Sequence, residues 1–403
     1  MTTVSELDLP AFDYTDESLA GPRFHTALEE LRSETWIARA EPVGFLVLDR
    51  DAVTHFLRTK SATFPGRRML EVQGVTEGAL YERMEGNLLD LDGEDHRRLR
   101  KLVQPAFTPA AADRQRAAMR RHLSALVKQV EGKGCCDFVE SFAKPYPSLM
   151  IATVMGAPLE DAGRLHEWAN LIQGQFDPVA VATRLDALDR AAVEFVDYTR
   201  GLIQARREHP GEDLISELIA AEEEGDRLSE EECVHLVSAV LVGGVDTTQS
   251  QLAHGVRLFA EHPDQWRLLA ERPELASAAV EEVLRFEPIT PFTARIALED
   301  IHYRDVTFPR DTLIFAAAVT ANRDQAEYHA PGDFDITADR GRAKPLTFGA
   351  GPHFCLGANL ARAELQEAFA LLARELPELQ LDGEPVYESP LGVYGLRELP
   401  IRF

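Results

Sequence analysis

Residues 346–357 read Leu346-Thr347-Phe348-Gly349-Ala350-Gly351-Pro352-His353-Phe354-Cys355-Leu356-Gly357. Gly349 and Gly351 allow backbone conformations that other residues avoid, which predicts a tight loop whose N–H groups point at the Cys355 sulfur. A periodic pattern follows Leu356 and predicts a helix whose positive N-terminal end lies beside this thiol. Both features favour the thiolate, which is the form of cysteine that binds metal. The stretch therefore predicts a metal ligand; a buried cysteine in a glycine-rich turn is the alternative.

The net charge of the chain limits the classes of molecule that it can bind. The 403 residues contain 42 Lys and Arg against 67 Asp and Glu, a net charge of −25. This balance argues against nucleic acid as a partner, and the length allows a large core. The most apolar of the long stretches, residues 236–245, is shorter than the roughly 20 residues that cross a bilayer. We therefore expect no membrane span.

The N-terminus and the cysteines indicate a compartment. No basic segment followed by an apolar run begins the chain, so we predict no secretory signal. The spacing of Cys135, Cys136, Cys233 and Cys355 suggests neither a disulfide framework nor a zinc site. We expect a reducing cytoplasm, with the first three cysteines structural.

Periodicity and turn residues predict helices in some segments and hairpins in others. Residues 36–39 and 45–48 read as a hairpin, and Asp16 is expected to open a helix that reaches Leu31. No period is sustained from residue 66 to 91, whereas residues 111–225 are helical with turns. The tail, residues 389–403, reads as a second hairpin.

A long helix is predicted from Ser229 to Pro263. Ser229 and Glu232 form a capping box, and Pro263 ends the pattern. Its middle contains Gly243-Gly244, which cost about 2 kcal/mol of helix propensity and are expected to loosen the helix and leave room beside it. Asp246-Thr247 follow and place an acid beside a hydroxyl. A helix kink without function is the alternative.

Two shorter motifs pair charged residues on helices. His96 and Arg100, four residues apart, share one helix face and suit an anionic group, although such pairs often face solvent. Glu282 and Arg285, three apart, form an ion pair to which we assign a structural role. A strand containing Arg295 is expected to follow.

Taken in their order along the chain, these motifs resemble those of the cytochrome P450 family. F-G-x-G-x-H-x-C-x-G resembles its haem loop, A-G-x-D-T its oxygen-activating helix, and E-x-x-R its structural pair. The resemblance covers nearly the whole chain and implies the mostly helical P450 fold with a small β-rich lobe (α+β), as one catalytic domain over residues 1–403. Gly243 replaces the alanine of the family pattern, and Pro345 stands where a histidine is frequent.

The resemblance also implies roles for individual residues. Cys355 would bind the iron of haem b as its axial ligand. Asp246 and Thr247 would relay protons as catalytic residues. The remaining haem-binding residues would be His96, Arg100, Arg295, Phe348, His353 and Gly357. Candidates for substrate contact are Val242, Gly243, Ile289, Thr290, Phe292, Val393 and Tyr394.

The implied activity is monooxygenation of a small apolar organic substrate with O2. The sequence contains no dinucleotide-binding fingerprint, so electrons would come from a separate ferredoxin system. We expect that ferredoxin to dock near basic residues close to the haem: Arg97, Arg98, Lys101, Arg340, Arg342 and Lys344. The alternatives are a peroxide-driven peroxygenase and a non-catalytic haem-binding protein. The sequence leaves the substrate open.

Overall fold

The computed structural model describes residues 1–223 and 228–403. The described chain forms two compact units, each assembled from segments that are far apart in sequence. Unit 1 comprises residues 1–65, 281–355 and 387–396, and unit 2 comprises the described parts of 66–280, 356–386 and 397–403. The expectation of one domain over residues 1–403 stays a prediction.

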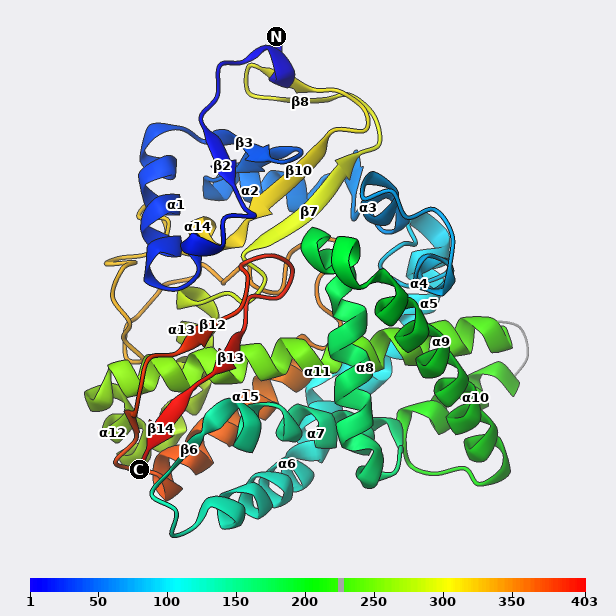
Figure 1. Ribbon diagram of the computed structural model, residues 1–403, viewed down its shortest axis with the longest axis vertical. Helices are drawn as coiled ribbons and strands as arrows, with labels where there is room; N and C mark the ends of the chain where they lie inside the picture. The colour runs from blue at the N-terminus through cyan, green and yellow to red at the C-terminus, as the bar shows by residue number, and fades with distance from the viewer. Residues whose placement is uncertain (224–227) are drawn as a thin grey trace. The chain divides into compact units, whose positions relative to one another are not determined.

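A six-stranded mixed sheet forms the centre of unit 1 (Figure 1). Its strand order is β2-β3-β4-β10-β7-β5; β2 pairs with β3 and β4 with β10 in parallel, and the other neighbours are antiparallel. The predicted hairpin of β3 and β4 is confirmed. The strands are β2 (Ala11–Asp13), β3 (Ile37–Glu41), β4 (Phe45–Val47), β5 (Ala62–Thr63), β7 (Phe292–Ala297) and β10 (Leu313–Ala317).

Alternating side chains divide unit 1 into two cores, one on each face of the sheet. Ile37 and Val47 belong to the core shared with α2 (Arg50–Arg58), whereas Ala38 and Leu46 belong to the core shared with α1 (Pro22–Glu34). This alternation follows from the two-residue period of a strand. A smaller sheet joins β1 (Thr2–Thr3), β9 (Val306–Phe308) and β8 (Ile301–Tyr303) to unit 1, and α14 (Ala318–Ala321) follows β10.

The first helix begins later than expected. Asp16 caps only a short 3-10 turn, Glu17–Leu19, and α1 begins at Pro22. Gly21 separates them with φ of 84°, a left-handed conformation that interrupts a helix. The prediction of a continuous helix from Asp16 to Leu31 was therefore wrong.

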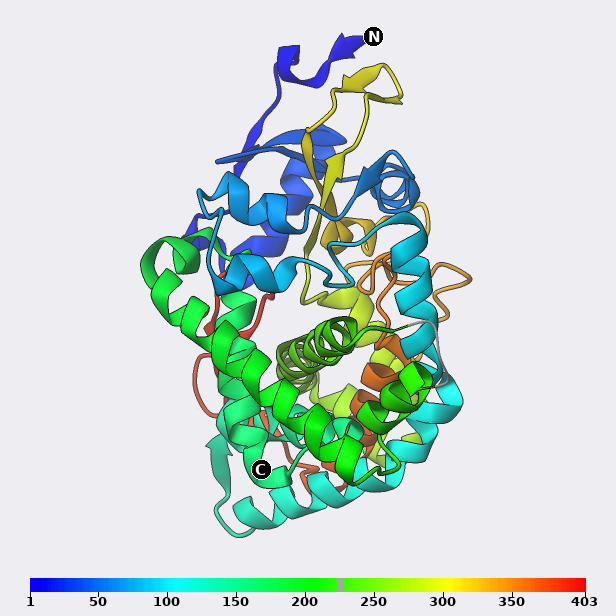
Figure 2. The ribbon, with the colours of Figure 1, turned by 90° about the vertical axis from the view of Figure 1, so that its right-hand side faces the viewer.

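Unit 2 is built mainly from helices that surround α11 (Glu230–Glu261). Figure 2 looks along this helix, and α7, α8, α9, α10, α12 and α15 all contact it. Besides α11, the helices that lie wholly in unit 2 are α3 (Arg67–Val72), α4 (Ala79–Met84), α5 (Gly93–Val103), α6 (Pro109–Val130), α7 (Pro145–Met155), α8 (Ala162–Gln173), α9 (Pro178–Glu208), α10 (Leu214–Glu223), α12 (Pro263–Glu271) and α15 (Ala358–Glu375). α13 (Ala276–Phe286) begins in unit 2 and ends in unit 1.

The predicted start of the long helix is confirmed. The N–H of Ser229 donates to Glu232 Oε2 at 2.7 Å, and the N–H of Glu232 donates to Ser229 Oγ at 3.2 Å. This is the reciprocal capping box, and the helix ends at Glu261, just before His262 and Pro263. The glycine pair does not interrupt α11, so the predicted loosening at this point was wrong.

The structure also differs from the sequence-based expectations in its short helices and in strand pairs between distant segments. Two six-residue helices, α3 and α4, occupy the stretch where no period was evident. A three-stranded sheet pairs β14 (Pro400–Arg402) with β6 (Cys135–Asp137) and β11 (Gln380–Leu381). The predicted C-terminal hairpin corresponds to β12 (Val386–Tyr387) and β13 (Leu396–Glu398), so it begins earlier and ends before β14.

Across residues 1–223 and 228–403, no helix combines the length and the apolar character that a membrane crossing requires.

Candidate active site

The loop before Cys355 is closed by its own backbone hydrogen bonds. The N–H of Gly349 donates to the Leu346 carbonyl at 2.8 Å, and the N–H of Cys355 donates to the Phe348 carbonyl at 3.0 Å. These two N–H groups therefore bond to carbonyl oxygens. The expectation that N–H groups of the loop point at the Cys355 sulfur stays a prediction. The Cys355 thiol is exposed, and α15 begins three residues later at Ala358.

Close packing fixes this loop to the rest of unit 1. Gly351 has φ of 77°, and a Cβ placed on it would lie 2.7 Å from the carbonyl oxygen of Leu57 at the end of α2. Only glycine fits such an approach. Leu346 and Ala350 are buried in the core shared with α2. The loop thus holds Cys355 on a rigid base.

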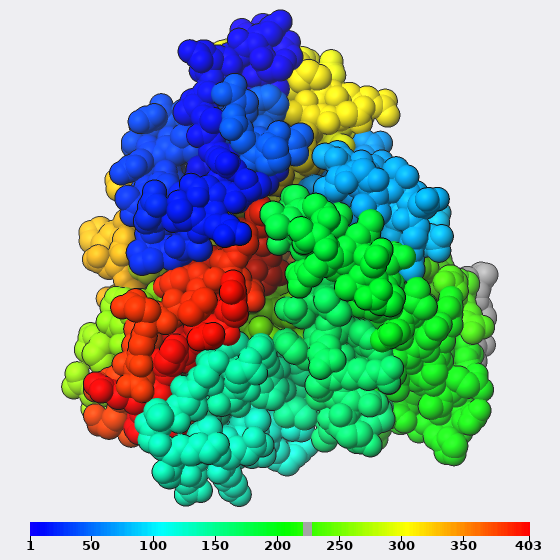
Figure 3. Space-filling model, in the orientation of Figure 1, coloured from blue at the N-terminus to red at the C-terminus, as the bar shows by residue number. Residues whose placement is uncertain are grey.

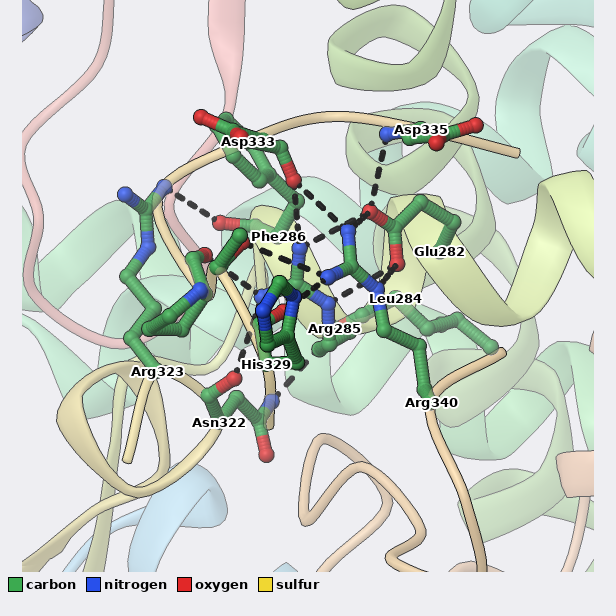
Figure 4. Close-up of polar contacts among 12 residues, drawn as sticks. Glu282, Leu284, Arg285, Phe286, Asn322, Arg323, His329, Asp333, Asp335 and Arg340 are labelled. Atoms are coloured by element: carbon green, nitrogen blue, oxygen red, sulfur yellow. Dashed lines mark hydrogen bonds and ion pairs between the residues drawn. The ribbon is translucent and has the colours of Figure 1, made fainter. Parts of the chain in front are cut away.

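Figure 4 shows a buried ionic cluster at the C-terminal end of α13. Arg285 Nε and Nη2 donate to the two carboxylate oxygens of Glu282, each at 2.8 Å. Arg340 makes a second forked contact, from Nη2 to Glu282 Oε1 at 2.6 Å and from Nε to Oε2 at 3.2 Å. The Glu282 and Arg285 side chains are 3% and 1% exposed. The predicted ion pair is therefore present, as part of a three-residue cluster.

The same guanidinium groups connect the cluster to distant backbone. Arg285 Nη1 donates to the carbonyl of Pro331 at 2.8 Å, and its Nη2 donates to that of Asp333 at 2.9 Å. Arg340 Nη1 donates to the carbonyl of His329 at 2.6 Å. The Pro331 carbonyl is buried and needs such a donor, and the contacts to His329 and Asp333 add to it, so the cluster organises residues 329–340.

The pKa of Glu282 reflects this arrangement. Burial raises it, and hydrogen bonds from Arg285 and Arg340 together with the charge of Arg285 lower it by more, so the net shift is downward. Glu282 is therefore an ionised carboxylate at neutral pH.

Two side chains join α13 to the cysteine loop. The Thr347 hydroxyl donates to the carbonyl of Leu284, and Asn322 Nδ2 donates to Thr347 Oγ1 at 3.0 Å. The N–H of Leu346 donates to Asn322 Oδ1 at 2.7 Å. Because Leu284 directly precedes Arg285, the ionic cluster and the loop share one scaffold. Asn322 was not among the predicted site residues, although it is fully buried.

The remaining candidates in unit 1 have different environments. Arg295 is buried on β7, and Phe292 is half-buried at the start of that strand. Ile289 is buried and Thr290 half-buried just before β7, and Val393 is half-buried. Tyr394 belongs to the core shared with α1, where its hydroxyl accepts the N–H of Gly21 at 2.7 Å. Its hydroxyl is therefore committed to the fold.

In unit 2, α5 carries the predicted His96 and Arg100 one turn apart. His96 is 3% exposed and Arg100 is half-buried. Arg98 of the same helix is ion-paired with Glu232 in the first turn of α11. Hydrogen bonding from Arg98, the largest cause, lowers the pKa of Glu232. This pair fixes α5 against α11.

The two glycines of α11 have different neighbours. A Cβ on Gly244 would lie 2.5 Å from Ile151 Cδ1 of α7, so this residue allows two helices to approach closely. Gly243 is exposed, and a Cβ there would meet no atom within 4 Å. The Thr247 hydroxyl donates to the Gly243 carbonyl at 2.8 Å. The predicted room therefore exists beside Gly243 alone, with Val242 and Asp246 buried next to it.

Glu364 of α15 is a buried acid that no sequence motif indicates. It is 3% exposed, and its Oε2 has no hydrogen-bond partner among the described residues. Burial raises its pKa to about 8, against a smaller lowering by a hydrogen bond with Thr248 of α11. Thr248 directly follows Thr247. At neutral pH Glu364 is therefore largely protonated.

This pKa predicts a pH dependence of stability. The unfolded carboxyl ionises near 4.5 and the folded one near 8, so the stability contributed by the neutral form is complete below pH 4.5 and is lost as pH rises to about 8. In Glu364→Gln, urea unfolding should show a smaller decrease in stability between pH 5 and pH 8, by roughly 1–4 kcal/mol. The exposed Glu378→Gln variant is the control. An unchanged pH slope in Glu364→Gln would contradict the assignment.

Comparison with known proteins identifies the family. The sequence model of the cytochrome P450 family matches residues 35–383. The chain belongs to the cytochrome P450 family. It is 39% identical over 409 aligned residues to luteothin monooxygenase of Streptomyces thioluteus, covering 100% of this chain and 98% of that protein. It is accordingly a P450 monooxygenase of the bacterial type.

Two solved structures support the predicted P450 fold. The crystal structure of CalO2 is 32% identical with a TM-score of 0.90, and the match covers 98% of this chain and 99% of that one. P450BioI, solved in complex with an acyl carrier protein ligated to hexadec-9Z-enoic acid, is 32% identical with a TM-score of 0.84 and covers 94% and 98%. The mainly helical fold with a small β-rich part is confirmed.

The residues of this P450 fit the haem-thiolate cofactor that the family implies. Cys355 presents an exposed thiol from a fixed loop. A Cβ on Gly357, at the N-cap of α15, would meet no atom within 4 Å, which leaves open space beside the first helical turn. Imidazole and guanidinium groups of His96, Arg100 and Arg295 are suitable donors to carboxylates. The donor set and the open space both suit a flat ligand with acidic side chains.

Proposed function

We propose that this P450 binds haem b and uses O2 to oxidise a small apolar organic substrate in the cytoplasm. The observation that carries the proposal is the exposed thiol of Cys355, held on a rigid loop directly before α15. When bound, the haem supplies the oxygen chemistry, and the chain supplies the thiolate, the protons and the binding surface. Membership of the family supports each of these assignments.

The chain offers distinct residues for holding the cofactor. Cys355 would bind the iron, and His96, Arg100 and Arg295 would donate to the haem carboxylates. Phe348, His353 and Gly357 would also hold the haem. These roles are supported by the resemblance and by the exposed thiol, the open side of Gly357 and the basic side chains in this structure.

Asp246 and Thr247 are the proposed proton donors. Thr247 is half-buried one turn after the exposed Gly243, so its hydroxyl borders the open side of α11. Asp246 supplies a carboxylate at the position directly before Thr247. Val242, Gly243, Ile289, Thr290, Phe292 and Val393 are proposed substrate contacts. Tyr394 is left out of these proposed substrate contacts because its hydroxyl bonds to the N–H of Gly21.

Replacing Thr247 tests the proton step. In Thr247→Ala, the amount of product formed per O2 consumed should fall about 10-fold or more, because a positioned proton donor is lost and reduced oxygen leaves as hydrogen peroxide. Thr247→Ser keeps the hydroxyl and should recover most of the yield. Equal yields from the alanine variant and the unchanged protein would remove Thr247 from the mechanism.

The function itself is tested by reconstitution. Purified protein with a ferredoxin, its reductase, NADPH and ¹⁸O-labelled O2 should convert members of an apolar compound panel to products that carry one labelled oxygen. Turnover with hydrogen peroxide alone would favour the peroxygenase alternative. Ligand binding without turnover under either condition would favour a haem-binding protein that is not an enzyme.

The ferredoxin partner is proposed from exposed basic residues in an acidic chain. Arg97 and Lys101 on α5, and Arg342 and Lys344 after Arg340, are exposed. Arg340 and Arg98 belong to internal ion pairs with Glu282 and Glu232, so they are removed from the docking set that the sequence suggested.

Charge reversal tests this partner. The double variant Arg97→Glu/Arg342→Glu should be reduced more slowly by ferredoxin at low salt, because attraction between opposite charges speeds association. The difference should diminish at high salt. Reduction at the unchanged rate in low salt would contradict ferredoxin docking at these residues.

A further inference from the structure

Arg83 is a buried cation whose bonded partners are all neutral. It lies on α4 and is 5% exposed. Its Nη2 donates to Gln175 Oε1 at 3.0 Å and to Met84 Sδ at 3.8 Å. Its Nε is buried and has no acceptor in residues 1–223 or 228–403. Burial lowers the pKa of Arg83 to about 10, so the side chain still carries its charge at neutral pH.

The carboxylates of Glu71, Glu85 and Asp189, in neighbouring segments, bond to groups other than Arg83. Glu85 contacts Arg67 at 3.6 Å, and Glu71 accepts the Tyr81 hydroxyl at 2.8 Å. Asp189 of α9 accepts the N–H of Leu80 at 2.7 Å, and α4 packs against α9, as the neighbouring blue and green surfaces of Figure 3 show. Among the described residues, Arg83 therefore forms no ion pair.

Such an arrangement is unfavourable unless an anion completes it. A buried charge without a counter-ion costs far more than a buried neutral group, and a guanidinium group gains most from a carboxylate. Gln175, on the turn between α8 and α9, is 3% exposed and can only supply a neutral oxygen. The nearby His235 adds no negative charge. Its pKa is lowered mainly by burial, and the charge of Arg83 contributes to the lowering.

Buried apolar side chains in the same segment as Arg83 indicate that the rest of the ligand is apolar. Leu70, Val75, Leu80 and Met84 are buried in the segment from α3 to α4. Gln73 adds a buried amide oxygen without a hydrogen-bond partner among the described residues, and its Nε2 donates to the Gln175 carbonyl at 3.5 Å. The segment that carries Arg83 therefore combines one cation, an unsatisfied amide oxygen and buried apolar side chains.

We propose that Arg83 is an anion-binding residue that pairs with the carboxylate of an otherwise apolar substrate. This inference rests on the proposed function, because the carboxylate belongs to the molecule to be oxidised. Arg83 orients that molecule by its acidic end and selects acids over neutral compounds of the same length.

The test compares a carboxylate with its neutral isostere. Calorimetric titration of the haem-loaded protein at pH 7.5 with decanoate and decanamide, and with tetradecanoate and its amide, measures the preference without requiring turnover. The acids should bind about 10- to 100-fold more tightly than the amides. Arg83→Met should reduce this ratio to about 1, and Arg83→Lys should keep part of it. The exposed Arg121→Met variant is the control and should keep it fully.

A second variant keeps the test independent of any folding defect in Arg83→Met. Gln175→Glu places a carboxylate at the position that Nη2 already contacts. It should raise the melting temperature and abolish the preference for acids, because the cation is then neutralised internally. A lower melting temperature together with an unchanged preference would overturn the proposal.

The remaining outcomes are also decisive. Equal binding of acid and amide by the unaltered protein, no binding of either acid, or a preference that survives Arg83→Met would each overturn the proposal. Binding of inorganic phosphate that requires Arg83, without binding of the acids, would make this a free-anion site and would overturn the substrate role. Failure of the monooxygenase assay alone would overturn the proposed function and leave the measured acid preference standing.

Discussion

Replacing Arg285 by leucine is expected to reduce the stability of the protein by about 3–5 kcal/mol. The substitution leaves Glu282, 3% exposed, with Arg340 as its remaining guanidinium partner, and removes the donors to the carbonyl oxygens of Pro331 and Asp333. A buried carboxylate that loses a partner costs more than the pair itself contributes. Urea unfolding followed by circular dichroism measures the change.

The control for this experiment is Arg310→Leu. Its side chain is 68% exposed and contacts Asp311 at only 3.8 Å, so its loss should change stability by less than about 1 kcal/mol. The two variants remove the same group from different environments. If Arg285→Leu also loses less than about 1 kcal/mol, the cluster in Figure 4 does not organise residues 329–340 as described.

Replacing Cys355 by alanine is expected to abolish substrate oxidation. The thiol is the group proposed to bind the iron, and no neighbouring residue of the loop offers a second sulfur. Cys135→Ala is the matched control, because Cys135 is also exposed but lies on β6. Product formation with ferredoxin, reductase and NADPH measures both variants. Full activity in Cys355→Ala would contradict the assigned ligand.

Much of this architecture could be predicted because it depends on local patterns. The capping box at Ser229 and the proline at 263 bound α11 correctly, since both act through neighbouring residues. Glu282 and Arg285 were paired correctly for the same reason, being three residues apart on one helix. The loop around Cys355 was recognised from two glycines and the helix that follows it.

Other features could not be predicted because they depend on contacts between distant residues. Arg340 read as a surface cation, yet it bonds to Glu282, 58 positions away. β6 pairs with β14 near the C-terminus, and nothing in three residues of β6 indicates that partner. Gly243 and Gly244 look alike in sequence and differ only because Ile151 lies against one of them. Six-residue helices such as α3 are too short to show a period.

The burial of Glu364 and Arg83 also depends on contacts between distant residues, so the sequence could not predict it. Glu364 occupies a helix whose pattern gave no sign that this acid faces the core, and Arg83 lies where no element was predicted. A charged residue in an amphipathic pattern is normally solvated, so burial of this kind becomes visible only in the folded chain. For Glu364 and Arg83, the structure therefore reveals a burial that the sequence does not indicate.

The central claim is that Cys355 is the thiolate ligand of a haem iron. It is tested most directly by the absorption spectrum of the purified, dithionite-reduced protein under carbon monoxide. We predict a Soret band shifted far to the red, as thiolate-ligated haem gives, and its loss in Cys355→Ala. A band at the ordinary histidine-ligated position in the unaltered protein, or the same red-shifted band in Cys355→Ala, would contradict the account.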